Sequence, residues 1–102
     1  MIEIIELTKS PRENKRFQAT LNIDGKLKKI NFGQEGGSTY IDEGDERKRE
    51  NYRARHLASK REGHYIRSLS PTPATLSYWL LWGDSTDLCD NLVELQKKWS
   101  RG

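Results

Sequence analysis

The segment that most restricts the fold is RFQATLNIDGKLKKINFGQ, residues 16–34. Its first half alternates apolar and polar residues, which is the period of a strand with one buried face. The apolar positions are Phe17, Ala19, Leu21 and Ile23. Asp24 and Gly25 follow at once, and this dipeptide favours the positive φ angles of a two-residue turn. The chain then returns with Ile30 and Phe32 on one face, so these residues predict an antiparallel β-hairpin.

A third strand is expected at residues 2–8, IEIIELT, which are rich in β-branched and apolar side chains. The apolar phase slips between Ile4 and Ile5, so we expect either a β-bulge or burial on both faces there. Three antiparallel strands form a small sheet that needs a cover on one face. The glycines at 33, 36 and 37 are expected to end this sheet in a mobile loop, because they match neither a P-loop nor a dinucleotide-binding turn.

The second half of the chain is expected to supply the cover. A first helix is predicted from about Glu46 to Ser59. Asp45 is its expected N-cap, and Gly63 is expected to stop it. Residues 64–73, HYIRSLSPTP, contain two prolines and predict a loop.

A second helix is predicted from Pro73 to Trp82, and a third begins at a cap formed by Asp84 or Ser85. The third helix carries an apolar stripe that comprises Leu88, Leu92, Leu95 and Trp99. The fold class that follows is α+β: a three-stranded antiparallel sheet, made of a β-hairpin plus an N-terminal strand, followed by three helices. The second and third helices should cover one sheet face, with the first helix alongside.

The most apolar stretch is TLSYWLLW, residues 75–82. Its apolar side chains surround a helix on nearly all sides, which is typical of a buried helix. Only 33% of the chain is hydrophobic, so exposing two tryptophans here would forfeit several kcal/mol and create an adhesive patch. We therefore expect a core helix. The alternative is that one edge, at Tyr78 or Trp82, extends into a protein interface, where aromatic residues concentrate.

The chain has 102 residues, which predicts a single domain over residues 1–102. One cysteine excludes an internal disulfide, and with two histidines it provides no usual structural zinc site. Cys89 is expected to be a buried structural thiol. The N-terminus lacks a signal-peptide pattern and no stretch is apolar enough to span a membrane, so an intracellular, reducing compartment is expected.

The basic segment ERKRENYRARHLASKR, residues 46–61, is the main candidate for a binding surface. The net charge of +3 favours anionic partners only mildly. On a helix, however, Arg49, Arg53 and Lys60 fall with His56 inside a wedge of about 60°. Such a stripe can contact successive phosphates, with Tyr52 and His56 available to stack on bases. The residues assigned to this nucleic-acid-binding surface are Arg47, Lys48, Arg49, Tyr52, Arg53, Arg55, His56 and Lys60.

Two other interpretations of this segment stay open. The acids at 42–46 and Glu50 can pair with many of its cations, which would make it an ordinary solvated or protein-facing surface. Tyr52 and His56 are four residues apart and could also simply pack together on the sheet. No catalytic or metal-binding spacing surrounds the two histidines, so no catalytic residue, metal or cofactor is expected and the protein is predicted not to be an enzyme.

Several motifs run in order through nearly the whole chain: KRF at 15–17, DGKLKKINFG at 24–33, YRARH at 52–56 and ATLSYWLLWG at 74–83. With its Y-x-x-R-H and S-x-[WY]-x-L-W elements, the chain resembles an uncharacterised family of small proteins, about 100 residues long, of large DNA viruses and phages. It has Tyr78 where that family usually has arginine, and His64-Tyr65 where it tends to have a tryptophan. The resemblance implies a viral or phage protein with a β-hairpin followed by helices, and it implies no activity.

These observations lead to two hypotheses. The first is a small non-enzymatic accessory protein that binds nucleic-acid backbone through the basic helix, located in the host cytoplasm or nucleoid. The second is a minor virion or capsid-associated protein, or an inhibitor that binds a host protein, with oligomerisation as an option. Neither hypothesis involves a membrane.

Overall fold

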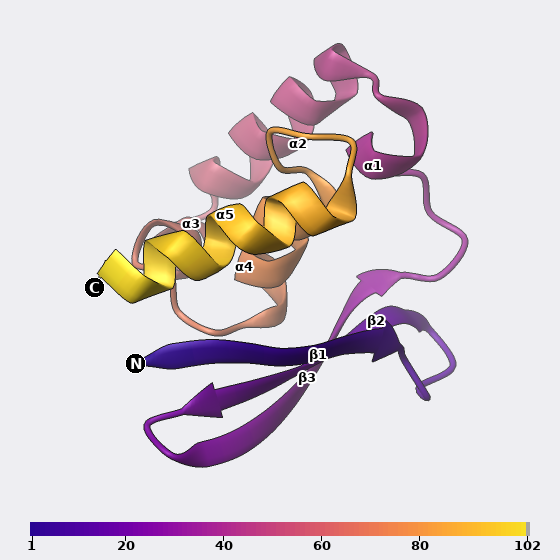
Figure 1. Cartoon of the computed structure of the whole chain (residues 1–102). Helices are drawn as coiled ribbons and strands as arrows, with labels where there is room; N and C mark the ends of the chain where they lie inside the picture. The colour runs from indigo at the N-terminus through magenta and orange to yellow at the C-terminus, as the bar shows by residue number, and fades with distance from the viewer. Residues whose placement is uncertain (102) are drawn as a thin grey trace.

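The computed structural model describes residues 1–101; Gly102 lies outside them. Its fold is a three-stranded antiparallel sheet with helices packed over one face, as Figure 1 shows, so the predicted α+β class is confirmed. The strands lie in the order β1-β2-β3. Their bounds are β1 (Ile2–Lys9), β2 (Lys15–Ile23) and β3 (Lys26–Gln34). The helices that follow are α1 (Tyr40–Glu43), α2 (Glu46–Ala58), α3 (Lys60–Arg67), α4 (Pro73–Leu76), the π-helix η1 (Ser77–Leu81) and α5 (Leu88–Arg101).

The predicted hairpin is confirmed. Phe17 lies opposite Phe32 and Ala19 opposite Ile30 in the β2–β3 register. Asp24 and Gly25 both have positive φ, at 53° and 90°, as a type I′ turn requires. Asn22 supports the turn, because its side-chain oxygen accepts a hydrogen bond from the Gly25 amide at 2.9 Å.

The N-terminal strand has the bulge that its apolar phase suggested. The β1–β2 register shifts between Ile4 and Glu6. Ile5 is 53% exposed, so burial on both faces does not occur there. The free edge of β1 is covered instead by Gln96 of α5, whose amide accepts from the Ile4 N–H at 2.7 Å and donates to the Ile2 carbonyl at 2.9 Å. This side chain occupies the hydrogen-bonding groups that a further strand would use.

The core lies between the sheet and the helices η1 and α5. It is formed by Ala19, Leu21, Ile30 and Phe32 of the sheet together with Leu76, Leu80, Leu81, Leu95 and Trp99. Residues 75–82 thus belong to the core, as predicted from the apolar side chains on nearly all sides of this helix. Its last part is a π-helix rather than an α-helix, because the Trp82 amide donates to the Ser77 carbonyl, five residues back, at 3.2 Å.

The loop predicted over residues 64–73 is partly wrong, since residues 64–67 belong to the helix α3, which runs from Lys60 to Arg67. The first helix ends at Ala58, and Ser59 caps α3 by accepting from the Glu62 amide at 3.4 Å. Gly63 does not stop a helix but lies buried inside α3. A Cβ atom there would lie 2.5 Å from the Leu57 carbonyl oxygen, so glycine is needed for the close approach of α2 and α3.

Cys89 also differs from the prediction, because its side chain is exposed. It lies on α5 outside the apolar stripe, of which Leu95 and Trp99 are 1% and 7% exposed. The stripe itself packs as predicted, and the Trp99 indole donates to the Leu69 carbonyl at 2.8 Å. Within residues 1–101, no helix has the length and apolarity needed to cross a membrane.

Candidate functional site

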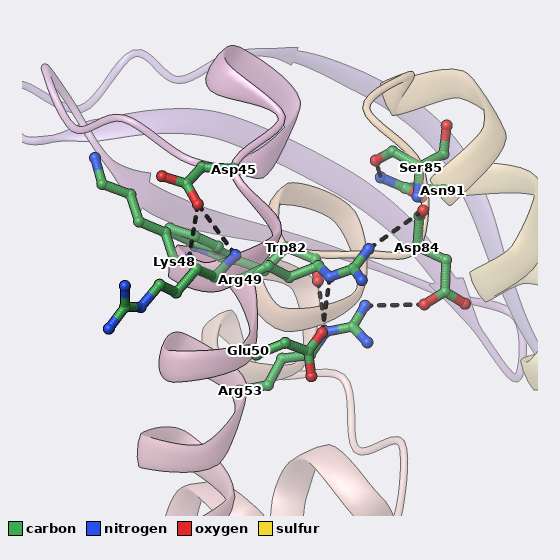
Figure 2. Close-up of polar contacts among 10 residues, drawn as sticks. Asp45, Lys48, Arg49, Glu50, Arg53, Trp82, Asp84, Ser85 and Asn91 are labelled. Carbon is green, nitrogen blue, oxygen red and sulfur yellow. Dashed lines mark hydrogen bonds and ion pairs between the residues drawn. The ribbon is translucent and has the colours of Figure 1, made fainter.

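The acidic residues before α2 are used mainly for local structure. Asp45 caps α2 by accepting from the backbone amides of Arg47 and Lys48 at 3.0 and 3.1 Å, as predicted and as Figure 2 shows. Asp42 pairs with Arg16 of β2 through two hydrogen bonds of 2.6 Å. Only Glu43 reaches a cation of α2, the Lys48 amine at 3.0 Å. The expected neutralisation of the basic helix by residues 42–46 is therefore limited to one pair within residues 1–101.

Arg53 is directed toward the segment that follows η1 rather than toward solvent (Figure 2). Its Nε donates to the Trp82 carbonyl at 2.9 Å, and its Nη2 pairs with Asp84 at 3.0 Å. The guanidinium also lies over the Tyr78 ring, 5.4 Å from its centroid. With 17% of its side chain exposed, Arg53 has few donors left for a ligand.

Arg49 is held in the same way. Its guanidinium lies over the Tyr40 ring at 4.5 Å, and its Nη1 donates to the Asp84 carbonyl at 3.5 Å. Its side chain is 16% exposed and its Nε pairs with Glu50 at 3.0 Å. The stripe inferred from helical spacing thus does not form one exposed cationic surface, because two of its arginines pack the helix against the rest of the protein.

Tyr52 is enclosed in a stack of three rings. Trp82 lies on one side at 4.4 Å with an interplanar angle of 9°, and His56 lies at 3.9 Å. Tyr52 and His56 therefore pack together, as the second interpretation of this segment stated, but the third ring of the stack is Trp82 and not a residue of the sheet. Burial raises the pKa of Tyr52 to about 12, so its hydroxyl keeps its proton at neutral pH.

The two aromatic residues assigned to a protein interface occupy interior positions. Tyr78 is 6% exposed and offers almost no surface to a partner, so its assignment is corrected. Trp82 is half-buried, and one face of its ring stacks on Tyr52. Both residues belong to the packing between α2 and η1.

A cleft lies between α2, η1 and the loop that follows β3. We call it the α2 cleft; its volume is about 330 Å³ and its lining residues are Gly33, Gln34, Gly37, Ser38, Thr39, Tyr52, Arg55, His56, Ser77, Leu81 and Trp82. Residues from both sequence motifs, 52–56 and 77–82, meet here although they are far apart in the chain. The π-helix turn brings them together, and such turns are frequent at functional sites.

The α2 cleft continues into two shallower depressions along the free edge of β3. The first shares Tyr52, His56 and Ser77 with the cleft and extends to Lys15 and Pro73. The second shares Lys15 and Pro73 and extends along β3; its other lining residues are Arg12, Lys28, Lys29, Ile30, Asn31, Pro71 and Thr72. We call these two depressions together the β3-edge groove.

The groove and the cleft are strongly cationic. Their cations are Arg12, Lys15, Lys28, Lys29 and Arg55. Each is exposed, and none of them makes an ion pair within residues 1–101. Among the lining residues of that part of the chain Glu62 is the one acid, with Oε2 at 3.6 Å from His56 Nε2. This arrangement concentrates positive potential along one track.

Of the residues predicted to contact nucleic acid, the structure brings Tyr52, Arg55 and His56 to the cleft. Arg47 and Lys60 are exposed but lie outside the lining of the groove and the cleft, and Lys48 is paired with Glu43. Sequence reasoning missed the hairpin cations at 12, 15, 28 and 29. Their signal was the density of lysine and arginine in residues 12–29, but each cation alone is typical of an ordinary exposed surface residue. Across residues 1–101, no three His, Cys, Asp or Glu side chains gather as metal ligands.

Comparison with known proteins places these features in a family. The model of a family of unknown function, DUF5754, matches residues 5–56, from β1 to the last motif residue of α2. An uncharacterised protein of Acanthamoeba polyphaga mimivirus is 39% identical over 80 residues, which cover 76% of this chain and 80% of that protein. No solved structure matches the chain.

Proposed function

We propose that this chain, which belongs to the DUF5754 family of unknown function and is similar to a giant-virus protein, binds nucleic-acid backbone along the β3-edge groove. The binding is non-enzymatic, and it serves an accessory role in the virus. The observation that carries this proposal is the continuous track of unpaired cations from Lys28 and Lys29 through Lys15 to Arg55.

The physical reason is that a polynucleotide presents a regular series of phosphates. Cations spaced along a groove neutralise several of them at once and release counterions, which supplies most of a sequence-independent affinity. The cations of α2 that face η1 cannot do this, since Arg49 and Arg53 already donate to Asp84 and Trp82. The groove cations have no such partners within residues 1–101.

The shape of the track favours a single strand over a duplex. The groove leads into a cleft of about 330 Å³, which is at the lower end of the volumes of small-molecule sites, about 300–1,000 Å³. A strand backbone can follow this edge, whereas the width of a duplex keeps most of its phosphates outside. The aromatic rings at the cleft are used in internal packing, so we expect little base selectivity.

The test compares two triple variants of equal charge. In the first, Lys15, Lys28 and Lys29 of the groove are changed to Gln; in the second, Arg47, Lys48 and Lys60 of the helix surface are changed to Gln. Fluorescence anisotropy with a labelled single strand is measured over a range of salt concentrations. The logarithm of the association constant is plotted against the logarithm of the salt concentration. The groove variant should reduce the magnitude of this slope by about 2, since each single-strand phosphate contact contributes about 0.7.

The helix-surface variant is the control and should change the slope little. If it weakens binding as much as the groove variant does, the groove is not the binding surface. If the unaltered protein binds no strand at low salt and tens of micromolar concentration, the proposed function is wrong. A labelled duplex of the same sequence, run in parallel, shows whether the single strand is preferred.

A second candidate function, assembly with other proteins in a viral particle, is favoured by a separate observation. Ile5 of β1 and Val93 of α5 are each 53% exposed and line one apolar depression with Leu7 and Leu92. Exposed apolar clusters on small proteins often mark interaction surfaces. Light scattering on Ile5→Ser and Val93→Ser tests it: a fall in mass relative to the unaltered protein supports assembly, and a monomer in every case contradicts self-assembly.

A further inference from the structure

The α2 cleft holds donors that the fold does not use, and two of them, the hydroxyl groups of Tyr52 and Ser77, also play no part in the proposed groove binding. The hydroxyl groups of Tyr52 and Ser77 and the guanidinium of Arg55 make no side-chain hydrogen bond within residues 1–101. No carboxylate belongs to the cleft's own lining. Donors that converge in a concave site without an acid are the usual setting for an anion.

His56 adds a fourth group with a fixed orientation. Its Nδ1 lies 2.9 Å from the Tyr52 carbonyl oxygen, which can only accept, so Nδ1 carries the proton. The ring is therefore held with Nε2 on its other side, where Glu62 Oε2 stands 3.6 Å away. His56 therefore contributes to the cleft through its stack on Tyr52, which fixes the position of that ring.

The ring of Tyr52 and the backbone of Ser77 are held in place before any ligand arrives. The stack of Trp82, Tyr52 and His56 fixes the side of α2 that faces the cleft. Across from it, Ser77 begins the π-helix and its carbonyl accepts from Trp82. A site whose side chains are already ordered loses little entropy when it binds, which is the basis of tight recognition of a small group.

The opposite wall is formed by the glycine-rich loop. Gly33 has a φ of 80°, and a Cβ atom there would lie 3.0 Å from Cδ1 of Leu81. Glycine therefore lets the end of β3 approach η1 closely, and this approach closes the cleft on one side. From the sequence, Gly33 was expected only to end the sheet in a mobile loop.

We propose that the α2 cleft binds a phosphomonoester, the terminal phosphate of a strand whose backbone lies in the β3-edge groove. The inference rests on the proposed function for the strand, because the groove leads directly into the cleft through Tyr52, His56 and Ser77. A terminal phosphate carries about −1.5 to −2 charges at neutral pH and three acceptor oxygens, whereas an internal phosphate carries one charge. The cluster of donors in the cleft fits the terminal group better.

The experiment compares single strands of one sequence that carry a 5′-phosphate, a 3′-phosphate or no terminal phosphate. One of the phosphorylated strands should bind about tenfold more tightly than the unmodified strand. In Arg55→Gln and in Ser77→Ala this ratio should fall to about one. Lys28→Gln, in the groove, should weaken binding of all three strands alike and keep the ratio. Circular dichroism of each variant confirms that the fold is retained.

The outcomes separate the two proposals. Equal affinity for all three strands overturns the phosphomonoester site and leaves groove binding intact. If no strand binds but a nucleoside monophosphate binds and its affinity falls in Arg55→Gln, the cleft takes free phosphomonoesters and the groove proposal is wrong. If neither the strands nor the nucleoside monophosphate bind, both proposals are overturned.

Discussion

The ring of Tyr52 lies 4.4 Å from the ring of Trp82 and is nearly parallel to it. This contact joins α2 to the segment after η1 and brings the two motif segments, 52–56 and 77–82, into one site. Arg53, one residue on from Tyr52, donates to the carbonyl of the same tryptophan at 2.9 Å. These contacts at Trp82 help to hold α2 against the core, and they also shape the cleft.

Removing the Trp82 side chain should destabilise the protein substantially. We expect Trp82→Ala to lower the free energy of unfolding by about 2–4 kcal/mol, because it removes a large half-buried ring and its stack on Tyr52. Tyr52→Phe is the matched control: it keeps the stack and removes only the hydroxyl, so its effect should stay within about 1 kcal/mol. Urea unfolding measures both. A loss below about 0.5 kcal/mol for Trp82→Ala would show that the stack does not hold α2.

The role assigned to Arg53 is structural, and its effect on stability can be separated from the effect of losing one positive charge. Arg53→Gln should cost about 1–2 kcal/mol, because it breaks the hydrogen bond to the Trp82 carbonyl and the pair with Asp84. Arg47→Gln removes the same charge from an exposed position and should change stability by no more than about 0.5 kcal/mol. Thermal unfolding of the two variants compares them. Equal stability would mean that the Arg53 contacts contribute nothing.

The hairpin and the cap at Asp45 could be predicted because their signals are local. Alternation of apolar residues sets the strand face, Asp24 and Gly25 set the turn, and Asp45 bonds amides two and three residues ahead. The helix α3 was missed because Gly63 was interpreted as a stop signal. The pattern of Ser59 followed by Glu62 three residues later is a capping signal. It marks the start of α3 and would have predicted this helix.

The contacts that hold the arginines of α2 could not be predicted from their spacing in the sequence. The groups that bind Arg49 and Arg53 include the backbone carbonyls of Asp84 and Trp82, which lie 35 and 29 residues away along the chain. Any residue carries a carbonyl, so the sequence holds no mark of these contacts. The groove was hidden for a related reason: its cations come from the hairpin and α2, and only the tertiary fold brings them onto one track.

Asn91 is expected to be essential for the loop between η1 and α5. It is 3% exposed, and its amide donates to the carbonyls of Leu80 and Ser85 at 3.0 and 2.8 Å and accepts from the Ser85 amide at 3.1 Å. Asn91→Ala leaves these backbone groups unpaired and should cost about 2–3 kcal/mol. Asn51→Ala, on the exposed side of α2, is the control and should change stability little. Similar unfolding midpoints for the two variants would contradict this role.

The pair of Asp42 with Arg16 links α1 to the sheet and should make stability depend on pH. The hydrogen bonds from Arg16 and Thr39 lower the pKa of Asp42 from 3.8 to about 2. A carboxyl whose pKa is lower in the folded state stabilises the protein above its unfolded pKa, and this contribution is lost as the pH falls through the folded pKa. The window for Asp42 therefore lies between about pH 4 and pH 2.

We expect Asp42→Asn to lower the free energy of unfolding by about 1 kcal/mol at pH 7, a value kept small because 31% of the side chain is exposed and the pair is screened by solvent. The difference from the unaltered protein should shrink below pH 4 and vanish near pH 2, where Asp42 is half protonated or more. Urea unfolding at pH 7, 5, 3 and 2 gives the curve. Arg16→Gln should show the same pH dependence, and the double variant should cost little more than either single change, because each removes the same interaction. A difference that stays constant from pH 7 to pH 2 would show that the ionised carboxylate is not what stabilises this contact.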